Sequence, residues 1–371
     1  MDKDTLFSSF GKWISPINTD FFDEQVKIRK LDYYTKKLTT EAYLKLMLLA
    51  QLNQWDSLHE MSDALVDEGL QETVGFQSIS VSQLSRRNRE IPSDVMAMIF
   101  FQLVSKIKAF HQKTQPSMPL NIIDSTTIPL NLGKYAWADF RKTKAGIKVH
   151  LRLVMMDQHM TYPDQLTITP AKEHDRGQLE VLIDDKNATY VFDRGYIDYE
   201  RFDRMTDDGY FFVSRLKANA VTHPIKSFDT GENPAILSDQ MVWLGTSPSL
   251  AENVFRLVEV LDHRGKTLRL ITNRFDILPE EVSEIYRARW AIELFFKWLK
   301  QHVKIKTFYG ESENAVKNQI YTALIVYCLH VLIQLEMNRQ RKILQIQRWL
   351  KRLLWKPANQ WVRRMEDRTV P

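Results

Sequence analysis

The sequence contains a single cysteine, Cys328, among its 371 residues. One thiol cannot form a disulfide within the chain or build a cysteine zinc site, which excludes disulfide scaffolds and favours a reducing compartment. Long apolar runs are also missing. The most apolar stretch, Ile320 to Leu335, spans 16 residues, fewer than a bilayer-crossing helix needs. We therefore expect a buried core helix there and no membrane partner.

A secretory signal is absent too. The opening residues MDKDTLFSSFGKW include acids and no apolar core run, so we expect a cytoplasmic protein. Acidic charge is scarce at the other end, where Lys297 to Pro371 holds 15 lysines and arginines against 5 aspartates and glutamates. The whole chain carries a net charge of only +5, so the positive charge is concentrated in this tail. That asymmetry favours a polyanionic partner.

The first part of the chain, residues 1–115, has a helical pattern. A hydroxyl cap at Thr39-Thr40 precedes the apolar-periodic run EAYLKLMLLAQLNQW. Ser78 to Ile91 (SISVSQLSRRNREI) predicts a short helix carrying Arg86, Arg87 and Arg89. This helix is either the recognition helix of a helix-turn-helix or a solvated basic face, and the sequence does not choose between them.

Strand patterns follow the polar, proline-containing boundary at residues 113–119. Short apolar runs at Leu120–Asp124, Gly146–Met156 and Thr189–Asp193 predict strands, and residues 211–272 are rich in strand patterns. From Pro279 the pattern is helical again. The order predicts an α/β fold in which a β-rich block, at about 216–273, interrupts the central domain.

Two acids lie at the ends of the predicted strands. Asp124 ends LNIID and Asp193 ends YVFD, and acids at the carboxyl ends of buried strands occupy the edge where α/β sheets place functional residues. Neighbouring carboxylates repel unless a proton or a cation lies between them, and Mg²⁺ prefers oxygen ligands. The alternative for each residue alone is an aspartate that caps a turn.

The most informative segment is Ile285 to Lys300, IYRARWAIELFFKWLK. On one helix, a polar face would carry these five residues: Tyr286, Arg289, Glu293, Lys297 and Lys300. The adjoining apolar face would pack on the sheet. Cations outnumber the single acid, which fits a metal ligand set among phosphate-binding side chains better than a solvated Glu–Lys ladder.

These residues resemble a known pattern. The spacing of Tyr286, Arg289, Glu293 and Lys300 matches the Y-R-E-K signature of the insertion-sequence-four family of bacterial DDE transposases, and DSTT at Asp124 and DRGY resemble its acid motifs. The acids lie 69 and then 100 residues apart, and the longer gap resembles the family's β-strand insertion.

The resemblance implies a DNA transposase with an RNase H-like catalytic core at 116–335, interrupted by the β-rich insertion. A helical DNA-binding domain at 1–115 and a basic helical segment at 336–371 would flank it. The metal-binding and catalytic residues would be Asp124, Asp193 and Glu293, using Mg²⁺, with Mn²⁺ able to substitute.

The implied partners are the double-stranded inverted-repeat ends and target DNA, bound by a homodimer in a synaptic complex. Cut-and-paste transposition would proceed by nicking, hairpin formation and strand transfer. Tyr286, Arg289, Lys297 and Lys300 would bind DNA phosphates. Trp243 would stack on an extruded base, or else pack in the core of the insertion.

Other residues carry weaker expectations. His174-Asp175 resembles a further family pattern, with Asp175 supporting the site or capping a helix, and His150 fits a structural role. For Trp349, Trp355 and Trp361 we expect core packing, with contact to DNA or a second subunit as the alternative. Two other functions stay open for the chain as a whole: a silent DNA-binding remnant, and an RNase H-fold nuclease without strand transfer.

Overall fold

The fold is taken from a computed structural model of the whole chain, which describes residues 8–114, 118–141, 144–157, 160–173, 175–337 and 341–366. His174 lies outside these described residues. The chain divides into two compact units. The first comprises residues 1–114, 131–137 and 297–371, and the second comprises 115–130 and 138–296.

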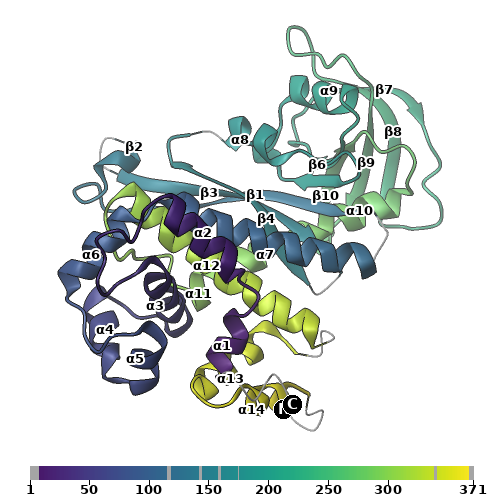
Figure 1. Cartoon of the computed structure of the whole chain (residues 1–371). Helices are drawn as coiled ribbons and strands as arrows, with labels where there is room; N and C mark the ends of the chain where they lie inside the picture. Colours follow the sequence, from purple (N-terminus) through teal and green to yellow (C-terminus); the bar gives the residue numbers. More distant parts are fainter. Residues whose placement is uncertain are drawn as a thin grey trace. The chain divides into compact units, whose positions relative to one another are not determined.

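The first unit is helical (Figure 1). Its described α-helices are α1 (Ser9–Ile14), α2 (Thr19–Ile28), α3 (Thr40–Asn53), α4 (Leu58–Asp63), α5 (Glu68–Val74), α6 (Val81–Glu90), α7 (Ser93–Thr114), α12 (Glu313–Glu336), α13 (Ile343–Leu353) and α14 (Ala358–Glu366). As the sequence predicts, the hydroxyl of Thr39 caps α3 by accepting from the amide of Ala42.

The core of this unit forms around α12, which packs against α7 and α3. Residues such as Leu324, Cys328 and Leu329 of α12 are almost completely buried. Among the described helices, α12 alone is long and apolar enough to cross a membrane, yet most of it is buried inside the protein. The expectation of a buried core helix at 320–335 is therefore confirmed.

The division of the chain differs from the sequence-based boundaries at residues 131–137, which belong to the first unit, and again further along the chain. The sequence grouped residues 297–335 with the central domain, whereas they belong to the helical first unit. The physical reason is the apolar surface of α12, which is buried by α3 and α7. The helix α11 (Trp290–His302) runs across the division.

The three tryptophans of the basic tail contribute to packing. Trp361 is fully buried, and Trp355 meets the ring of Phe10 edge-on at 5.8 Å. The guanidinium groups of Arg341 and Arg364 lie over the ring of Trp349, 5.3 and 5.5 Å from its centroid. Core packing, the interpretation favoured by the sequence, is confirmed for Trp361, whereas Trp349 and Trp355 are half-buried.

The described part of the second unit forms one ten-stranded sheet with the order β2-β3-β1-β5-β6-β10-β9-β8-β7, and β4 pairs with β3 away from this path. Its strands are β1 (Leu120–Leu130), β2 (Asp139–Arg141), β3 (Lys144–Met155), β4 (Thr161–Pro170), β5 (Thr189–Phe192), β6 (Phe211–Arg215), β7 (Thr222–Ser227), β8 (Ile236–Leu244), β9 (Phe255–Leu261) and β10 (Thr267–Thr272).

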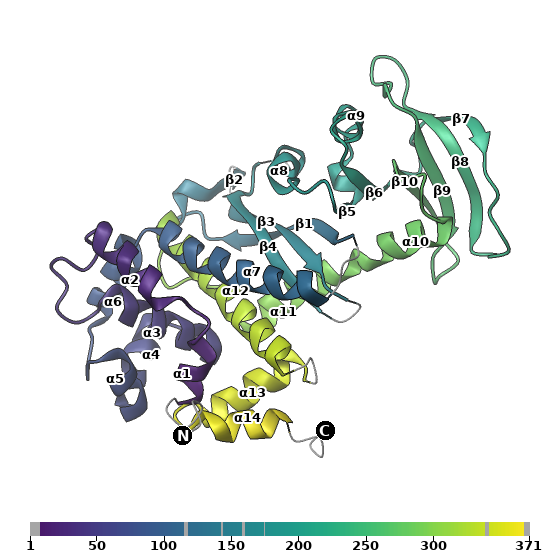
Figure 2. The ribbon, with the colours of Figure 1, turned by 45° about the vertical axis from the view of Figure 1, so that its right-hand side comes forward.

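The middle of the sheet changes direction at β1. On one side β1 pairs with β3 antiparallel, and on the other it pairs with β5 parallel, as β5 does with β6. Helices α8 (Asp175–Leu182) and α9 (Tyr199–Asp207) lie on one face, and α10 (Pro279–Ala288) lies on the other (Figures 1 and 2). The α/β class predicted from the sequence is confirmed.

The β-rich insertion forms the outer strands β7 to β10 and extends the central sheet, because β10 pairs antiparallel with β6. An ion pair is buried within it. The guanidinium of Arg256 binds both oxygens of Asp239 at 2.9 and 2.7 Å. Pairing of this kind offsets the cost of burying both charges and fixes the register of β8 against β9.

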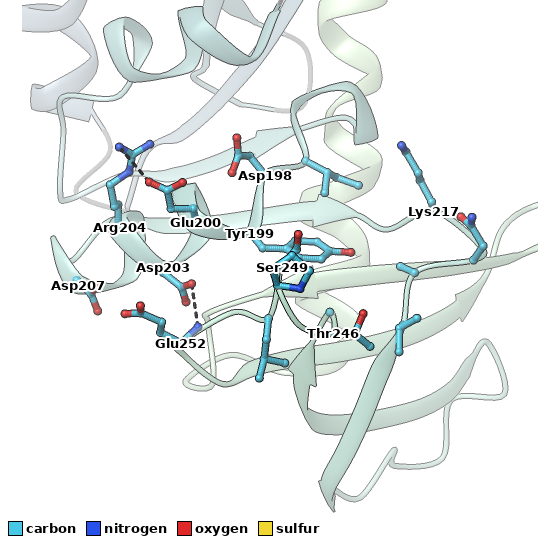
Figure 3. Close-up of a pocket in the computed structure, with 17 residues that line it drawn as sticks. Asp198, Tyr199, Glu200, Asp203, Arg204, Asp207, Lys217, Thr246, Ser249 and Glu252 are labelled. Atoms are coloured by element: carbon cyan, nitrogen blue, oxygen red, sulfur yellow. Dashed lines mark hydrogen bonds and ion pairs between the residues drawn. The ribbon is translucent and has the colours of Figure 1, made fainter.

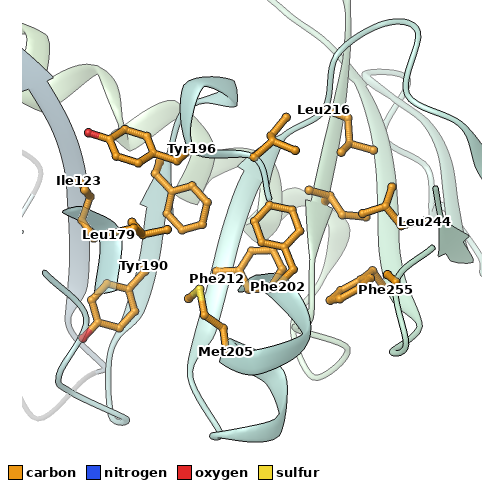
Figure 4. Close-up of a cluster of buried hydrophobic side chains, with 14 of the residues drawn as sticks. Ile123, Leu179, Tyr190, Tyr196, Phe202, Met205, Phe212, Leu216, Leu244 and Phe255 are labelled. Atoms are coloured by element: carbon orange, nitrogen blue, oxygen red, sulfur yellow. The ribbon is translucent and has the colours of Figure 1, made fainter. Parts of the chain in front are cut away.

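Aromatic side chains link the insertion to the rest of the sheet (Figure 4). The rings of Phe202 on α9 and Phe212 on β6 stack with centroids 4.5 Å apart, and Phe255 of β9 approaches Phe212 at 5.9 Å. Leu179 and Leu182 of α8 belong to the same cluster. Insertion and central strands therefore share one core.

Candidate functional site

Asp124 and Asp193 are neighbours in the middle of the sheet. The parallel register of β1 and β5 ends at the pair Ile123 and Phe192, and the two aspartates follow immediately. Adjacent strands lie about 4.8 Å apart, so the two aspartates start from neighbouring backbone positions. One expectation is wrong: Asp124 does not end its strand, because β1 continues to Leu130 through its antiparallel pairing with β3.

Each aspartate is fixed by one backbone amide. An Oδ1 oxygen of Asp124 accepts from the amide of Ser125 at 2.8 Å, and Oδ1 of Asp193 accepts from the amide of Gly195 at 2.7 Å. The second bond caps the short 3-10 turn Arg194–Tyr196. A Cβ at Gly195 would lie 2.9 Å from that carboxylate oxygen, so a larger residue there would displace the Asp193 side chain. Asp193 therefore caps a turn through Oδ1.

The third acid is carried by a bent helical segment. The sequence predicts an unbroken helix over 285–300, but α10 ends at Ala288 and α11 begins at Trp290. At the junction, the amide of Arg289 bonds to the carbonyl of Tyr286 at 3.2 Å. This tight turn retains helical dihedrals at Arg289, so Glu293 still follows one turn later on the same side.

Arg289 joins the residues of this segment to β1. Its Nη2 lies 2.6 Å from Oε1 of Glu293, and its Nη1 lies 3.3 Å from Oδ2 of Asp124. The guanidinium also lies 5.9 Å from the ring centroid of Tyr286. Its side chain is only 16% exposed, so these are contacts of a largely desolvated cation.

The surroundings of Asp124 are electrostatically crowded. Burial raises the pKa of the Asp124 carboxyl to about 6, and the negative charges of Asp193 and Glu293 add to the rise. The amide of Ser125 and the charge of Arg289 oppose it. The three acids predicted from the sequence thus lie within electrostatic range of one another, in surroundings that a further cation would stabilise.

The predicted cations Lys297 and Lys300 lie further along α11 and belong to the first unit. Lys297 is exposed, whereas Lys300 is half-buried. On the adjoining side of the same segment, Ile292, Phe295, Phe296 and Leu299 are buried. The predicted division of the helix into a polar and an apolar face is therefore confirmed.

Trp243 lies on the surface of the insertion. It is 38% exposed, between the buried residues Val242 and Leu244 of β8, and it pairs with His223 of β7. With Thr246, Ser247 and Leu250 the two residues line a hollow of about 360 Å³. Trp243 therefore lies outside the fully buried core of the insertion.

A polar network converges on Asp175, beside Asp124. The sequence indicated only some of its members. Asp175, which is the first residue of α8, accepts a hydrogen bond from the Ser125 hydroxyl at 2.8 Å. The ammonium group of Lys148 lies 3.3 Å from the same carboxylate, and Nδ1 of His150 lies 3.4 Å away. The sequence missed Ser125 and Lys148, although DSTT and the alternation in β3 placed both beside predicted site residues.

His150 has a structural role in this network, as expected. Its ring is fully buried, and its Nε2 lies 2.9 Å from the hydroxyl of Thr169. Burial lowers the pKa of the imidazole to about 4, so the ring is neutral at physiological pH. It therefore contributes a hydrogen-bonding ring rather than a charge.

A larger hollow, of about 740 Å³, lies between α9 and the loop Gly245–Glu252 (Figure 3). None of the three acids lines it, and two of its own five carboxylates hold the backbone. Asp198 caps α9, and Asp203 accepts from the amides of Glu252 and Asn253 at 2.9 and 2.8 Å. With five acidic residues against Arg204 and Lys217, its lining is unsuited to a phosphate.

The basic helix predicted at 78–91 forms as α6, with Ser80 and Gln83 making a capping box. Its arginines face different surroundings. Arg86 and Arg89 are exposed, but Arg87 is buried and binds Asp32 and Thr40. The solvated-face and recognition-helix alternatives therefore both fail for Arg87, which holds the fold together.

Comparison with known proteins identifies the family. The Transposase DDE domain matches residues 115–329, and a domain of unknown function (DUF4372) matches residues 6–77. The first match covers more than half of the chain, and the chain therefore belongs to the family of DDE transposases. It is an enzyme that cleaves and joins DNA.

The relatives place it among insertion-sequence transposases. The chain is 29% identical over 301 residues to a probable transposase for insertion sequence element IS5377 of Geobacillus stearothermophilus, across 80% of this chain and 76% of that protein. It is 32% identical over 252 residues to the putative transposase y4zB of Sinorhizobium fredii, across 66% and 69%. A solved piggyBac transposase synaptic complex with hairpin DNA has a TM-score of 0.47 and 11% identity, over 98% of this chain and 81% of that one.

Membership of this family implies a divalent metal ion. Among the described residues, no three His, Cys, Asp or Glu side chains gather closely enough to hold one. The chemistry of the side chains nevertheless suits such an ion. Asp124, Asp193 and Glu293 offer carboxylate oxygens, and their negative charges lie within electrostatic range of one another. Arg289 contacts one oxygen of Asp124 and one of Glu293 and provides positive charge there.

Proposed function

We propose that this transposase moves its insertion sequence by cut-and-paste transposition, with Asp124, Asp193 and Glu293 as the catalytic carboxylates. The observation that carries the proposal is the bridge through Arg289 from Glu293 to Asp124, beside Asp193 at the end of the adjacent parallel strand. Three acids from three separate parts of the chain thereby lie near one another, where a bound cation would stabilise their negative charge. The central strand order β4-β3-β1-β5-β6 supports an RNase H-like core.

The three carboxylates would hold Mg²⁺, or Mn²⁺ in its place. When bound, the ions supply an activated nucleophile and stabilise the charge on the leaving oxygen. In the first step, a water oxygen bonds to phosphorus and the P–O3′ bond breaks, giving a 3′-hydroxyl and a 5′-phosphate. In the second, the oxygen of that 3′-hydroxyl bonds to a phosphorus of the opposite strand and the P–O3′ bond to the flanking DNA breaks, which forms a hairpin and releases the flanking DNA with its own 3′-hydroxyl. Water then breaks the hairpin P–O3′ bond and regenerates the 3′-hydroxyl of the transposon end. That hydroxyl bonds to a phosphorus of target DNA, and a target 3′-hydroxyl leaves.

The side chains around the acids would position DNA. Arg289 presents a planar pair of donors suited to a phosphate, and Tyr286 lies against it. Lys297 and Lys300 follow on α11 and would bind further phosphates. Trp243, exposed beside the hollow shared with His223, would stack on the base extruded when the hairpin forms. Two copies of the chain would act together on the two transposon ends.

The test is a product assay with a labelled transposon-end duplex and Mg²⁺. We expect a nick, then a hairpin, then joined product. Asp124→Ala, Asp193→Ala and Glu293→Ala should each abolish cleavage and retain end binding. Glu200→Ala removes a side chain that is 82% exposed on α9 and should cleave normally.

The products separate the alternatives. Nicking without hairpin or joined product would assign a plain nuclease, and binding without any cleavage would assign a silent remnant. Normal cleavage by any one of the three alanine variants would remove that residue from the site.

A further inference from the structure

The loop between α2 and α3 carries an unusual concentration of cations and tyrosines. Lys30, Lys36 and Lys37 are all exposed, and none makes an ion pair within the part of the chain that the structure describes. Tyr33 is 70% exposed and Tyr34 is 91% exposed. Large aromatic rings in such positions lose apolar burial, so their exposure needs a reason beyond folding.

The loop is held in one shape by the buried arginine of α6. Arg87 donates from Nη1 to the carbonyl of Leu31 at 3.0 Å, and from Nη2 to the Asp32 carboxylate and, at 2.8 Å, to the Thr40 hydroxyl. Asp32 in turn accepts from the amide and the hydroxyl of Thr40 at 2.9 and 2.8 Å. The only acid of the loop is thereby neutralised, and the lysines and tyrosines around it are presented on a fixed frame.

The loop and α6 enclose a hollow of about 650 Å³ within the first unit. We call it the loop–α6 cleft; its polar and aromatic lining comprises Lys30, Tyr33, Tyr34, Thr35, Lys36, Lys37, Gln83, Arg86, Arg87 and Glu90. Glu90 is the only acid in this lining, and it lies 4.0 Å from Nε of Arg86. The three lysines leave the cleft with a surplus of positive charge that an anionic ligand would neutralise.

We infer that the loop–α6 cleft binds the phosphate backbone of duplex DNA. That the bound duplex is the transposon end rests on the function proposed above. Lysines bind phosphates as point charges, and tyrosine hydroxyls are common phosphate donors. The rings of Tyr33 and Tyr34 meet edge-on, at 4.6 Å and 83°, rather than presenting parallel faces. That geometry favours hydroxyl contacts with a duplex over the stacked aromatic platform that single-stranded DNA requires.

With DNA bound in the loop–α6 cleft, α6 would not act as a recognition helix. A recognition helix would direct its arginines into the major groove, but Arg87 is directed inward, where it holds the loop. The helix therefore forms one wall of the cleft, with Gln83 and Arg86, while the loop supplies most of the charge.

The experiment measures binding of the full chain to a fluorescein-labelled transposon-end duplex in EDTA, where no cleavage occurs. For Lys36→Ala/Lys37→Ala we expect Kd to rise at least about tenfold. The slope of log K against log salt should fall by about 2, since each phosphate contact contributes about 0.9. Tyr33→Phe should weaken binding by a few-fold. Lys27→Ala removes an exposed lysine of α2 outside the cleft and should bind like the wild type.

Wild-type affinity and salt slope in Lys36→Ala/Lys37→Ala would overturn the inference. So would cleft-dependent binding that is tighter for the single strand of the same sequence than for the duplex. A chain that binds DNA through this cleft but never cleaves it would refute the proposed function alone. A chain that cleaves transposon ends with binding insensitive to the cleft variants would refute this inference alone.

Discussion

Arg289 and Glu293 face each other across the junction of α10 and α11, with Nη2 of the arginine 2.6 Å from Oε1 of the glutamate. The second guanidinium nitrogen, Nη1, reaches Asp124 at 3.3 Å. One side chain thus occupies carboxylate oxygens that the proposed metal ions would use. A guanidinium and a divalent ion at this position compete for the same negative charge.

Replacement of Arg289 by alanine should therefore strengthen the response to Mg²⁺. Without the guanidinium, Asp124 and Glu293 repel each other until a cation binds, so the added ion gives more stabilisation. We expect the Mg²⁺-induced rise in Tm to exceed the wild-type rise by about 2–4 °C, equivalent to about 1 kcal/mol. Arg287→Ala, an exposed arginine in the last turn of α10, is the matched control. An equal rise in Arg289→Ala and wild type would show that the guanidinium does not compete.

Trp243→Ala should separate hairpin formation from nicking. The side chain is 38% exposed and lies apart from the three acids, so nicking should continue. The hairpin step should slow by about 10- to 100-fold, because stacking on one base contributes about 1–3 kcal/mol. Gel analysis of the two products measures both steps.

Val242→Ala provides the matched control on the same strand. Val242 is fully buried, so its truncation should cost about 2 kcal/mol of folding free energy while the hairpin-to-nick ratio stays normal. A normal ratio in Trp243→Ala would remove this residue from the DNA-contacting set.

The fold of the second unit depends on the buried pair of Arg152 and Asp164. Two guanidinium nitrogens bind the two carboxylate oxygens at 2.7 Å each, and both side chains are 2% exposed. Arg152→Met removes the guanidinium that binds both oxygens of a carboxylate only 2% exposed, and should lower the free energy of unfolding by about 3–5 kcal/mol. Urea denaturation measures the change.

Arg204→Met is the surface comparison, since Arg204 and its partner Glu180 are 53% and 58% exposed. This substitution should cost less than about 1 kcal/mol. The double variant Arg152→Met/Asp164→Leu should recover part of the loss. If Arg152→Met destabilised no more than Arg204→Met, the buried pair would contribute nothing to the fold.

Much of the site followed from local spacing alone. The interval from Arg289 to Glu293 is one helical turn, so their contact was predictable, and the small bend at Arg289 did not remove it. The position of Asp124 was harder to predict. The apolar run ends at Asp124, but β1 continues because β3 pairs with the polar residues that follow.

Tertiary packing decided what the sequence could not. The pattern RRNRE predicted arginines on a basic helix, yet Arg87 is buried because Asp32 and Thr40, far back in the chain, supply its partners. Strands β4 and β7 were missed, since prolines such as Pro163 and Pro224 obscure the alternation. No local signal showed that α12 packs on α3 and α7.

The most direct test of the account uses Fe²⁺ in place of the proposed Mg²⁺, with ascorbate and peroxide to generate hydroxyl radicals at the metal. The account predicts that the wild-type chain is cut near Asp124, Asp193 and Glu293, that excess Mg²⁺ suppresses all three cuts, and that Asp124→Ala loses them together. Cuts confined to other parts of the chain, or an unchanged pattern in Asp124→Ala, would contradict the account.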